Sequence, residues 1–397
     1  MMTKLEQLIK ELCPNGVRFI KLNTVCSIYD GTHQTPNYTT SGVQFVSVEN
    51  IGDLYATEKF ISEEDYNKYK IKPQINDVLM TRIGTIGTCA VVDRNTPLAY
   101  YVSLALLRPY IDVLNSKYLK YYIESKYGRK ELFKRTLVNA VPIKVNMGDI
   151  GKIIIAVPPI EVQREIVKVL DNFTELTAEL TAELTAELTA RKKQYEYYRD
   201  RLLNFDVRRE AEYEQCWKTL KDIAENCDSK RKPVTKGDRA SGIYPYYGAS
   251  GIVDYVDDYI FDGDYLLVSE DGANLLARST PIAFSISGKN WVNNHAHVLK
   301  FETYVTRRFV EIYLNSINLE KYISAAAQPK LTQDNLNKIP IPVPPLEEQE
   351  RIVSILDRFD KLCNDISVGL PAEIEARRKQ YEYYRDKLLS FEERKNA

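Results

Sequence analysis

The chain has 397 residues, of which 44% are hydrophobic and 27% charged, and its formal net charge is −1. This composition is ordinary for a soluble protein that builds real cores, with room for about two to three domains. No apolar run approaches the roughly 20 residues of a membrane span, and the start of the chain has no apolar segment like a secretory signal. The cysteines are scattered without a C-x-x-C pair, which favours reduced thiols in a cytoplasm over disulfides or a zinc finger.

The charge is distributed unevenly. Residues 1–152 carry 20 Lys and Arg against 15 Asp and Glu, whereas residues 153–210, 211–338 and 339–397 each have two more acidic than basic residues. The first segment is therefore basic enough to hold a polyanion unaided. The other segments need a local basic patch or a basic partner to do so.

Two segments of variable composition mix strand and helix patterns. Residues 1–152 begin with an amphipathic helix over 5–12 that Pro14-Asn15-Gly16 closes, and residues 211–338 contain strand-like runs broken by glycines. Each segment ends in a helical stretch rich in Tyr, Leu and Lys. The predicted strands are 43–48, 77–81, 104–107, 265–268 and 282–286, and the late helices are about 117–133 and 306–323.

The remaining segments are copies of each other. Residues 157–176 match residues 343–362 at 11 of 20 positions, and residues 190–205 match residues 376–391 at 13 of 16 positions. The offset is 186 residues in both blocks, so the spacing between the blocks is also kept. A duplication of this length predicts two similar units and a pseudo-two-fold molecule.

Each copied segment predicts a long helix. The helices start at Pro158-Pro159 and Pro344-Pro345, because proline can begin a helix but not continue one. Apolar residues then recur at helical spacing, and roughly 45 residues give a rod of about 65 Å. Two rods of equal length with apolar stripes pair most simply as an antiparallel coiled coil. Gly369-Leu370-Pro371 predicts a kink or restart in the second rod.

The first rod contains the four residues Thr-Ala-Glu-Leu three times in succession, over residues 177–188. These are good helix formers, so the simplest interpretation is a helical spacer. A repeat of this kind can gain or lose a unit of about 6 Å and a net twist of about 40° without other changes to the helix. If the rod separates two DNA-reading domains, the number of repeats sets their spacing on the duplex.

Over essentially its whole length, the chain resembles the specificity subunit of type I restriction–modification systems. The resemblance is carried by the V-P-P-(I/L)-E-x-Q starts, the ARKKQYEYYRD and ARRKQYEYYRD blocks, the four-residue spacer and the duplication. Weaker matches are Leu5–Gly16, Asp30-Gly31-Thr32-His33, and Gly248-Ala249-Ser250-Gly251 with Asn293-Asn294-His295-Ala296-His297.

The resemblance implies an α+β fold with two mixed α/β target-recognition domains, separated by two long antiparallel coiled-coil helices. The domains would be 1–152 and 211–338, and the conserved helical regions 153–210 and 339–397. It also implies that the chain reads a bipartite site in double-stranded DNA and docks two modification methyltransferase subunits, which restriction and translocase subunits join in the cytoplasm. The chain itself would be non-catalytic and bind no cofactor, with S-adenosylmethionine, ATP and Mg on the partner subunits.

The residues agree with a non-catalytic chain. An adenine methyltransferase needs a (D/N/S)-P-P-(Y/F/W) loop, but the double prolines here stand in Val157-Pro158-Pro159-Ile160 and Val343-Pro344-Pro345-Leu346. No phosphate-binding G-x-x-x-x-G-K-(S/T) loop is present. On a strand, His295 and His297 would point the same way and could ligate a metal, but without nearby cysteines we expect none.

Candidate DNA contacts lie in polar loops and basic runs, because Lys and Arg bind phosphates while side chains such as Gln read base edges. For each candidate the alternative is a solvated loop or surface. The candidates are Thr32, His33, Gln34, Arg82 and Lys144 in the first domain, and Lys230, Arg231, Lys232, Tyr246, Tyr247, Arg278, Asn293, Asn294, His295 and Lys330 in the second.

The tyrosine clusters at Tyr195, Tyr197 and Tyr198 and at their copies are identical in the two halves. Two halves that read different sequences would not use identical base-reading groups, so we expect helix packing or methyltransferase docking there. The docking candidates are Tyr195, Tyr198, Arg199, Tyr381, Tyr384 and Arg385.

Two other functions are open at this point. One is an enzyme, as the recognition half of a fused methyltransferase or nuclease, against which the missing methyltransferase loop speaks. The other is a coiled-coil assembly protein that never meets DNA.

Overall fold

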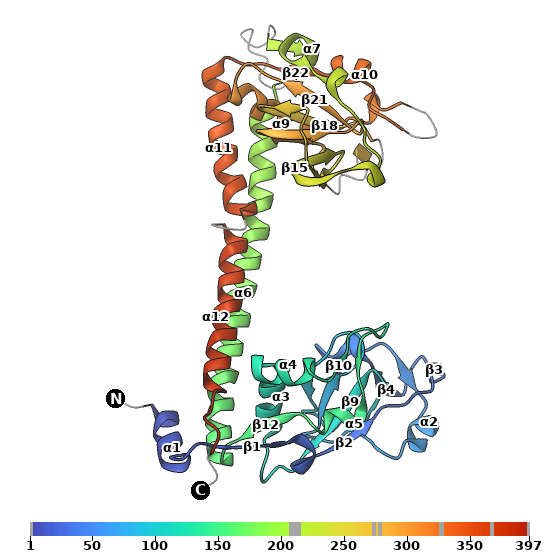
Figure 1. Ribbon diagram of the computed structural model, residues 1–397, viewed down its shortest axis with the longest axis vertical. Coiled ribbons are helices and arrows are strands. Elements are labelled where there is room, and N and C mark those ends of the chain that lie inside the picture. Colours follow the sequence, from blue (N-terminus) through green and yellow to red (C-terminus); the bar gives the residue numbers. More distant parts are fainter. Residues whose placement is uncertain are drawn as a thin grey trace. The chain divides into compact units, whose positions relative to one another are not determined.

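The computed structural model describes residues 3–205, 216–271, 275–276, 280–324, 329–365 and 369–394, and the predicted site residue Arg278 lies outside them. The chain forms two compact units (Figure 1). Unit 1 comprises residues 1–183 with 374–397, and unit 2 comprises residues 184–373. Among the helices described, none is long and apolar enough to cross a membrane.

Unit 1 contains two four-stranded sheets and two two-stranded ribbons. The central sheet is antiparallel, and in the other sheet β4 and β8 are parallel. The sheets are β2 (Cys26–Asp30)–β9 (Leu104–Pro109)–β6 (Val78–Thr81)–β7 (Cys89–Val91) and β3 (Tyr38–Thr39)–β5 (Phe60–Ile61)–β4 (Val43–Val46)–β8 (Leu98–Tyr100). The ribbons are β1 (Arg18–Lys21)–β12 (Ile154–Val157) and β10 (Thr136–Leu137)–β11 (Lys144–Val145), and the helices are α1 (Lys4–Leu12), α2 (Glu63–Lys68), α3 (Ser116–Glu124), α4 (Lys126–Phe133) and α5 (Met147–Ile150).

Unit 2 repeats this plan. Its central sheet has the same antiparallel order, and its second sheet again holds one parallel pair, β15 with β20. The sheets are β14 (Glu225–Asn226)–β21 (Ala296–Lys300)–β18 (Tyr265–Ser269)–β19 (Ala283–Ile286) and β16 (Gly251–Val256)–β15 (Ser241–Gly248)–β20 (Lys289–Val292)–β17 (Phe261–Asp262). The ribbon is β13 (Trp217–Thr219)–β22 (Pro340–Pro342), and the helices are α7 (Leu220–Ile223), α9 (Tyr304–Ser316) and α10 (Gln333–Asn337).

The copied segments form the long helices α6 (Ile160–Leu203), α11 (Leu346–Asn364) and α12 (Leu370–Leu388). A glutamine fixes each start: Gln163 and Gln349 are buried, and their side-chain amides donate to the carbonyls of Pro158 and Pro344, each at 2.7 Å. This contact gives a physical reason for the repeated V-P-P-x-E-x-Q pattern.

The predicted interruption of the second rod is confirmed, because α11 ends at Asn364 and α12 begins at Leu370. Gly369 lies between them, and a Cβ atom there would come within 2.7 Å of the Leu362 carbonyl oxygen. Any other residue at this position would therefore require the backbone to shift.

Within each unit, the sheet domain is fastened to the long helices at equivalent points. In unit 1, Lys117 and Tyr121 of α3 bind Asp171 of α6, at 2.7 Å and 2.8 Å. In unit 2, Arg308 of α9 binds Asp357, the copy of Asp171, at 2.8 Å, and Asp360 at 3.1 Å. These polar contacts hold each sheet domain against its own helices.

Candidate nucleic-acid interface

In unit 1, the predicted contact residues converge where three elements meet. We call this meeting point junction 1; it consists of the loop 30–34 after β2, the residues 82–84 after β6, and the hairpin 136–145 formed by β10 and β11. The Arg82 guanidinium lies 3.2 Å from Asp30 Oδ1 and donates to the Val145 carbonyl at 3.1 Å. The Nε2 atom of His33 lies 2.9 Å from the other oxygen of Asp30. Since Arg82 is only 6% exposed, it supports the loop and does not itself offer a surface contact.

The other candidates of junction 1 are more accessible. His33 and Gln34 are exposed, while Thr32 is half-buried and forms an isolated β-bridge with Tyr101. Lys144 is exposed and lies opposite Ile83 in an isolated β-bridge. These four residues lie at the end of the central sheet where β2 and β6 end.

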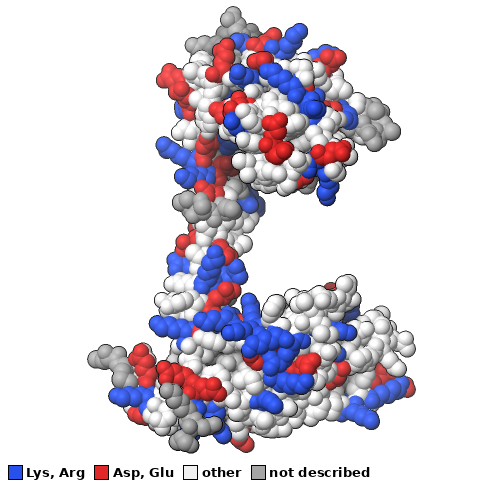
Figure 2. All heavy atoms as spheres, viewed as in Figure 1, with Lys and Arg blue, Asp and Glu red and all other residues white. Residues whose placement is uncertain are grey.

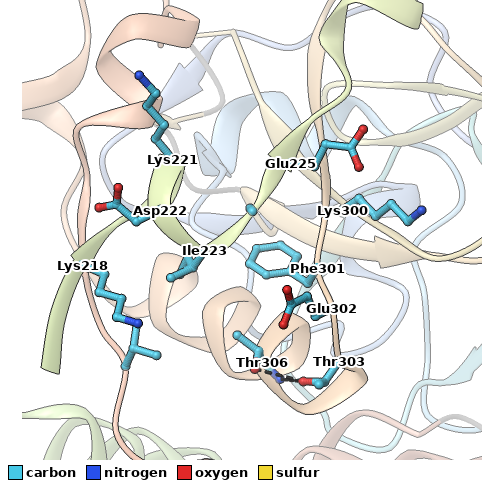
Figure 3. Close-up of a pocket in the computed structure, with 12 residues that line it drawn as sticks. Lys218, Lys221, Asp222, Ile223, Glu225, Lys300, Phe301, Glu302, Thr303 and Thr306 are labelled. Carbon is cyan, nitrogen blue, oxygen red and sulfur yellow. Dashed lines mark hydrogen bonds between the residues drawn. The ribbon is translucent and has the colours of Figure 1, made fainter.

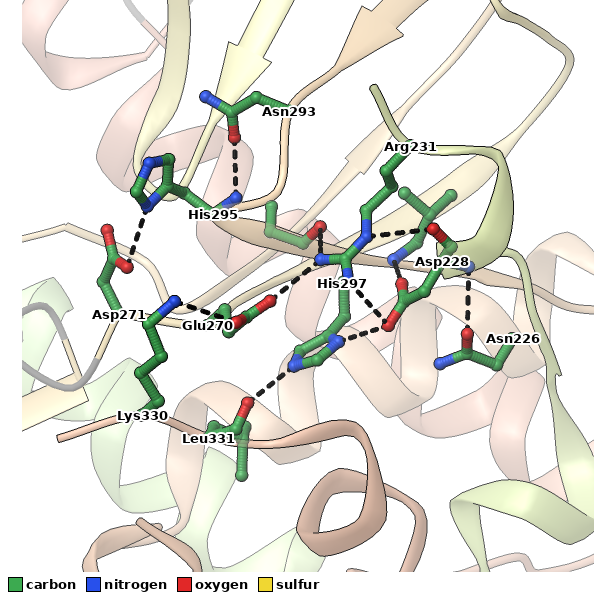
Figure 4. Close-up of polar contacts among 12 residues, drawn as sticks. Asn226, Asp228, Arg231, Glu270, Asp271, Asn293, His295, His297, Lys330 and Leu331 are labelled. Carbon is green, nitrogen blue, oxygen red and sulfur yellow. Dashed lines mark hydrogen bonds and ion pairs between the residues drawn. The ribbon is translucent and has the colours of Figure 1, made fainter. Parts of the chain in front are cut away.

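Unit 2 holds an equivalent junction 2, formed by residues 226–232 after β14, residues 270–271 after β18 and the segment around Lys330 (Figure 4). Arg231 lies 2.9 Å from Glu270 and 3.3 Å from Asp228, and Lys330 lies 3.1 Å from Glu270. Burial opposes ionisation of Glu270, but the hydrogen bonds from Arg231 and Lys330 outweigh it and hold its pKa below the ordinary value. Arg231 and Lys330 are therefore committed to an internal network.

A buried histidine forms the inner part of junction 2. His297 is fully buried; its Nδ1 lies 2.5 Å from Asp228 Oδ2 and its Nε2 lies 2.7 Å from the Leu331 carbonyl oxygen. The ring is thereby fixed between a carboxylate of the loop after β14 and the backbone of the segment around Lys330. Burial raises the pKa of Asp228, yet the bond to His297 helps to keep it below the ordinary value.

The two neighbouring histidines face different surroundings, because only His297 lies on β21 and the condition for a common direction is not met (Figure 4). His295 precedes β21, is exposed, and has its Nδ1 3.0 Å from Asp271 Oδ1. Its backbone N–H donates to the Asn293 side chain at 2.8 Å. Within the described part of the chain, no group of His, Cys, Asp and Glu side chains is arranged to hold a metal ion.

The remaining candidates of unit 2 differ in their burial. Tyr246 and Asn293 are buried, and the Tyr246 hydroxyl accepts a hydrogen bond from the Val234 backbone at 3.0 Å, so it holds the fold together. Tyr247 is half-buried against Phe284. Side chains that remain open to solvent are those of Lys230, Lys232 and Asn294.

The two junctions share one backbone frame, meaning the same pair of backbone hydrogen bonds around one central residue. That residue is basic in junction 1 and acidic in junction 2. The N–H of Arg82 donates to Ser103 and its carbonyl accepts from Val145, both at 2.9 Å. Glu270 makes the same two contacts with His295 and Leu331, at 2.9 Å and 3.0 Å. The basic residue paired with Asp30 in unit 1 is thus replaced by an acidic residue paired with Arg231 in unit 2.

A separate hollow in unit 2 does not have the character of a DNA or anion site (Figure 3). It measures about 700 Å³ and is lined by Lys218, Lys221 and Lys300. Acidic side chains stand among these lysines, namely Asp222, Glu225 and Glu302. The mixed charges leave no net attraction for a polyanion there.

The repeated tyrosines serve mainly to pack the helices. Tyr198 stacks on Phe359 and Tyr384 on Phe173, with ring centroids 5.7 Å and 5.8 Å apart. The other docking candidates are partly or fully covered: Tyr195 packs against the core of unit 2, Tyr381 lies 3.0 Å from Thr174, Arg199 lies over Tyr195, and the buried Arg385 binds Asp386. The middle tyrosine of each copy, Tyr197 or Tyr383, is 58% or 63% exposed and so provides the open surface.

The acidic partners of these networks were not predicted. Asp228, Glu270 and Asp271 lie in loops that carry no motif, and Asp228 meets His297 only across 69 residues of sequence. Asp30 was noted as part of a weak match, but without a role.

Comparison with known proteins agrees with a chain of two similar units, because one family model matches the chain twice. The family model described as the type I restriction modification DNA specificity domain matches residues 14–190 and 214–376. The chain belongs to this family of DNA specificity proteins. It is 34% identical over 309 residues to the EcoprrI specificity subunit of Escherichia coli, covering 75% of this chain and 74% of that one. It is 40% identical over 181 residues to the specificity subunit S.HindORF215P of Haemophilus influenzae, a match that spans about half of each protein, 45% and 46%.

Solved structures support the fold. A chain from a study of assembly and conformational transition in the type I restriction–modification system aligns with a TM-score of 0.68 at 15% identity, over 95% of this chain and 98% of that one. The HsdS subunit of Thermoanaerobacter tengcongensis aligns with a TM-score of 0.52 at 16% identity, over 95% and 96%. The predicted fold of mixed helix-and-strand domains with long helices is confirmed.

Proposed function

We propose that the chain reads a bipartite site in duplex DNA, one half-site with each junction, and holds the modification and restriction subunits that act on that site. The shared frame of the two junctions is the observation that carries this proposal. Equivalent backbone contacts surround Arg82 and Glu270, while the side chains differ in charge. A constant frame with variable polar groups is suited to presenting two different sequences to one kind of ligand.

The exposed polar groups at each junction supply the contacts. In unit 1 these are His33, Gln34 and Lys144, and in unit 2 they are Lys230, Lys232 and Asn294. Lysines bind phosphates and set affinity, whereas Gln and Asn amides pair with base edges and set sequence preference. The buried members of each junction hold these groups in place.

The helical copies dock two modification methyltransferase subunits. Tyr197 and Tyr383 support this assignment, because each is exposed, occupies the same place in its copy and lies edge-on to a packed neighbour, Tyr198 or Tyr384. Identical surfaces suit two identical partners. Restriction and translocase subunits complete the complex in the cytoplasm, and S-adenosylmethionine, ATP and Mg are bound by the partners.

A gel-shift experiment separates this function from its alternatives. The chain with its methyltransferase subunit should shift duplexes bearing a split site, with an affinity that falls as salt rises. Methyl transfer by the purified chain alone would favour a fused enzyme. The absence of any shift across many duplexes would favour an assembly protein that does not bind DNA.

A further inference from the structure

The β10–β11 hairpin of unit 1 carries a group of apolar side chains that face solvent. Val141 is 100% exposed, Phe133 at the end of α4 is 73% exposed and Val138 is 55% exposed. Leu137 and Ile143 are also open, at 43% and 39%. Single apolar side chains on a surface need no explanation, but five within eleven residues indicate a surface that a partner covers.

The hairpin is held rigidly at its base. Its last residue, Val145, is buried, donates to the Arg82 carbonyl and accepts from the Arg82 guanidinium, at 2.9 Å and 3.1 Å. One residue pair further out, the Gly84 N–H donates to the Ile143 carbonyl at 2.9 Å. The apolar tip therefore projects from the same junction that positions His33 and Lys144.

Basic side chains without acidic partners lie on α4, which leads into the hairpin, and on the hairpin itself. Arg129, Lys130 and Lys144 are exposed, and among the described residues none of the three forms an ion pair. By contrast, the nearby Lys134 and Arg135 are both paired with Glu131. Lys and Arg side chains gather over this part of unit 1 beside an uncharged projection (Figure 2).

The combination of an apolar tip and unpaired cations fits one class of partner better than another. A protein that covered the apolar residues would have to supply acidic groups at the rim. Duplex DNA supplies phosphates on both sides of every base step, and the gap between stacked base pairs accepts an apolar wedge. The observations thus favour DNA over a protein surface.

We propose that the β10–β11 hairpin is a wedge that inserts Val138 and Val141 between neighbouring base pairs of the half-site, while Arg129, Lys130 and Lys144 bind the flanking phosphates. This inference rests on the proposed function and adds to it a local distortion of the DNA. It concerns unit 1 alone, because the equivalent segment of unit 2 includes residues outside the described part of the chain.

The test uses the complex of the full chain with its methyltransferase subunits, on duplexes carrying the site mapped in cells. 2-Aminopurine, which brightens when it is unstacked, is placed at each position of both half-sites in turn. In the wild-type complex, the 2-aminopurine fluorescence should rise at one base step that does not contain the methylated adenine. V138S/V141S should abolish that signal and weaken binding about tenfold, because two apolar contacts are lost. The matched control I111S replaces a β-branched residue of unit 1, 59% exposed beyond the other end of β9, and should behave as wild type.

A second variant separates the two parts of the proposal. R129A/K130A should reduce the salt dependence of binding and keep the 2-aminopurine signal at saturating protein. Equal affinity and equal fluorescence of V138S/V141S and wild type would overturn the wedge. Loss of the methyltransferase subunit from V138S/V141S would also overturn it, in favour of a protein interface. If the wild-type complex bound no duplex, the proposed function itself would fail.

Discussion

The ring of Phe173 stacks on that of Tyr384, with 5.8 Å between centroids and 9° between planes. The residues that correspond to them by the offset of 186 are Phe359 and Tyr198, which stack at 5.7 Å and 26°. In each unit, the beginning of one copied segment therefore packs against the end of the other. The duplication provides both helices of both pairs, which explains why its two blocks and the spacing between them are kept together.

We predict that Tyr384→Ala lowers the stability of unit 1 and Tyr198→Ala that of unit 2, each by about 1–2 kcal/mol, because a stacked and partly buried ring is lost. Urea unfolding followed by circular dichroism measures the change. Tyr383→Ala is the control, since the Tyr383 ring is 63% exposed and only its edge contact with Tyr384 is lost, and it should cost less stability than Tyr384→Ala while weakening methyltransferase binding. Equal destabilisation by Tyr383→Ala would contradict this division of roles.

The four-residue repeats lie within one continuous helix, and the boundary between the units falls among them, between Glu183 and Leu184. Deleting 185–188 removes about 6 Å and about 40° of helix. We expect the gap between the half-sites to change by about one base pair, with both half-site sequences unchanged, as seen by mapping methylated adenines. A Thr185→Ala variant of normal length should keep the original gap. Altered half-sites in the deletion variant would disprove the spacer role.

The basic run after β14 should divide into two functions. Lys230 and Lys232 are exposed, whereas Arg231 bonds to Glu270 and to the Ala296 carbonyl, both at 2.9 Å. K230A/K232A should weaken binding to all sequences and lower the salt slope, without a change in thermal midpoint. Arg231→Ala should instead destabilise unit 2 by about 2–4 kcal/mol, because Asp228 and Glu270 both lose their ion pair with Arg231 and keep only His297 and Lys330 as side-chain partners. A normal thermal midpoint for Arg231→Ala would show that the network is dispensable.

Acid should weaken unit 2 through Glu270. Its pKa is lowered in the folded state, with burial opposing and the bonds to Arg231 and Lys330 producing the shift. A lowered pKa contributes stability above the unfolded value of about 4.3 that is lost as the pH falls through the folded value. The free energy of unfolding of Glu270→Gln should therefore fall less steeply below about pH 4.5 than that of the wild type. The control is Glu302→Gln, because Glu302 is exposed, and its acid profile should match the wild type. Identical acid profiles for the two variants would refute this assignment.

The long helices were predictable because their signals are local. Pro158-Pro159 marks one start, Gly369-Leu370-Pro371 marks the break, and both features stand in the structure at those places. The junction residues were predicted only in part: His33, Arg82 and Lys144 meet at junction 1 and Lys330 lies in junction 2, but the burial of Arg82 and Tyr246 was missed. The burial of these two side chains depends on partners outside their own strands, Val145 for Arg82 and Val234 for Tyr246. The local sequence pattern does not predict such pairs.

The boundaries predicted at residues 152, 210 and 338 divide the chain by sequence character. The compact units divide it differently, because each unit combines a sheet domain with parts of both copied segments. That grouping follows from two ring pairs that join one copied segment to the other, Phe173 with Tyr384 and Phe359 with Tyr198. The periodicity of one segment does not show which residues of the other segment it packs against.

Mapping methylated adenines in the DNA of cells that express this chain with its methyltransferase subunits tests the central claim most directly. The account predicts one bipartite site, with a methylated adenine in each half and a fixed gap between the halves. Exchanging residues 30–34 should change one half-site and leave the other as it was. A single uninterrupted site, or a change of both halves on exchange of that one loop, would contradict it.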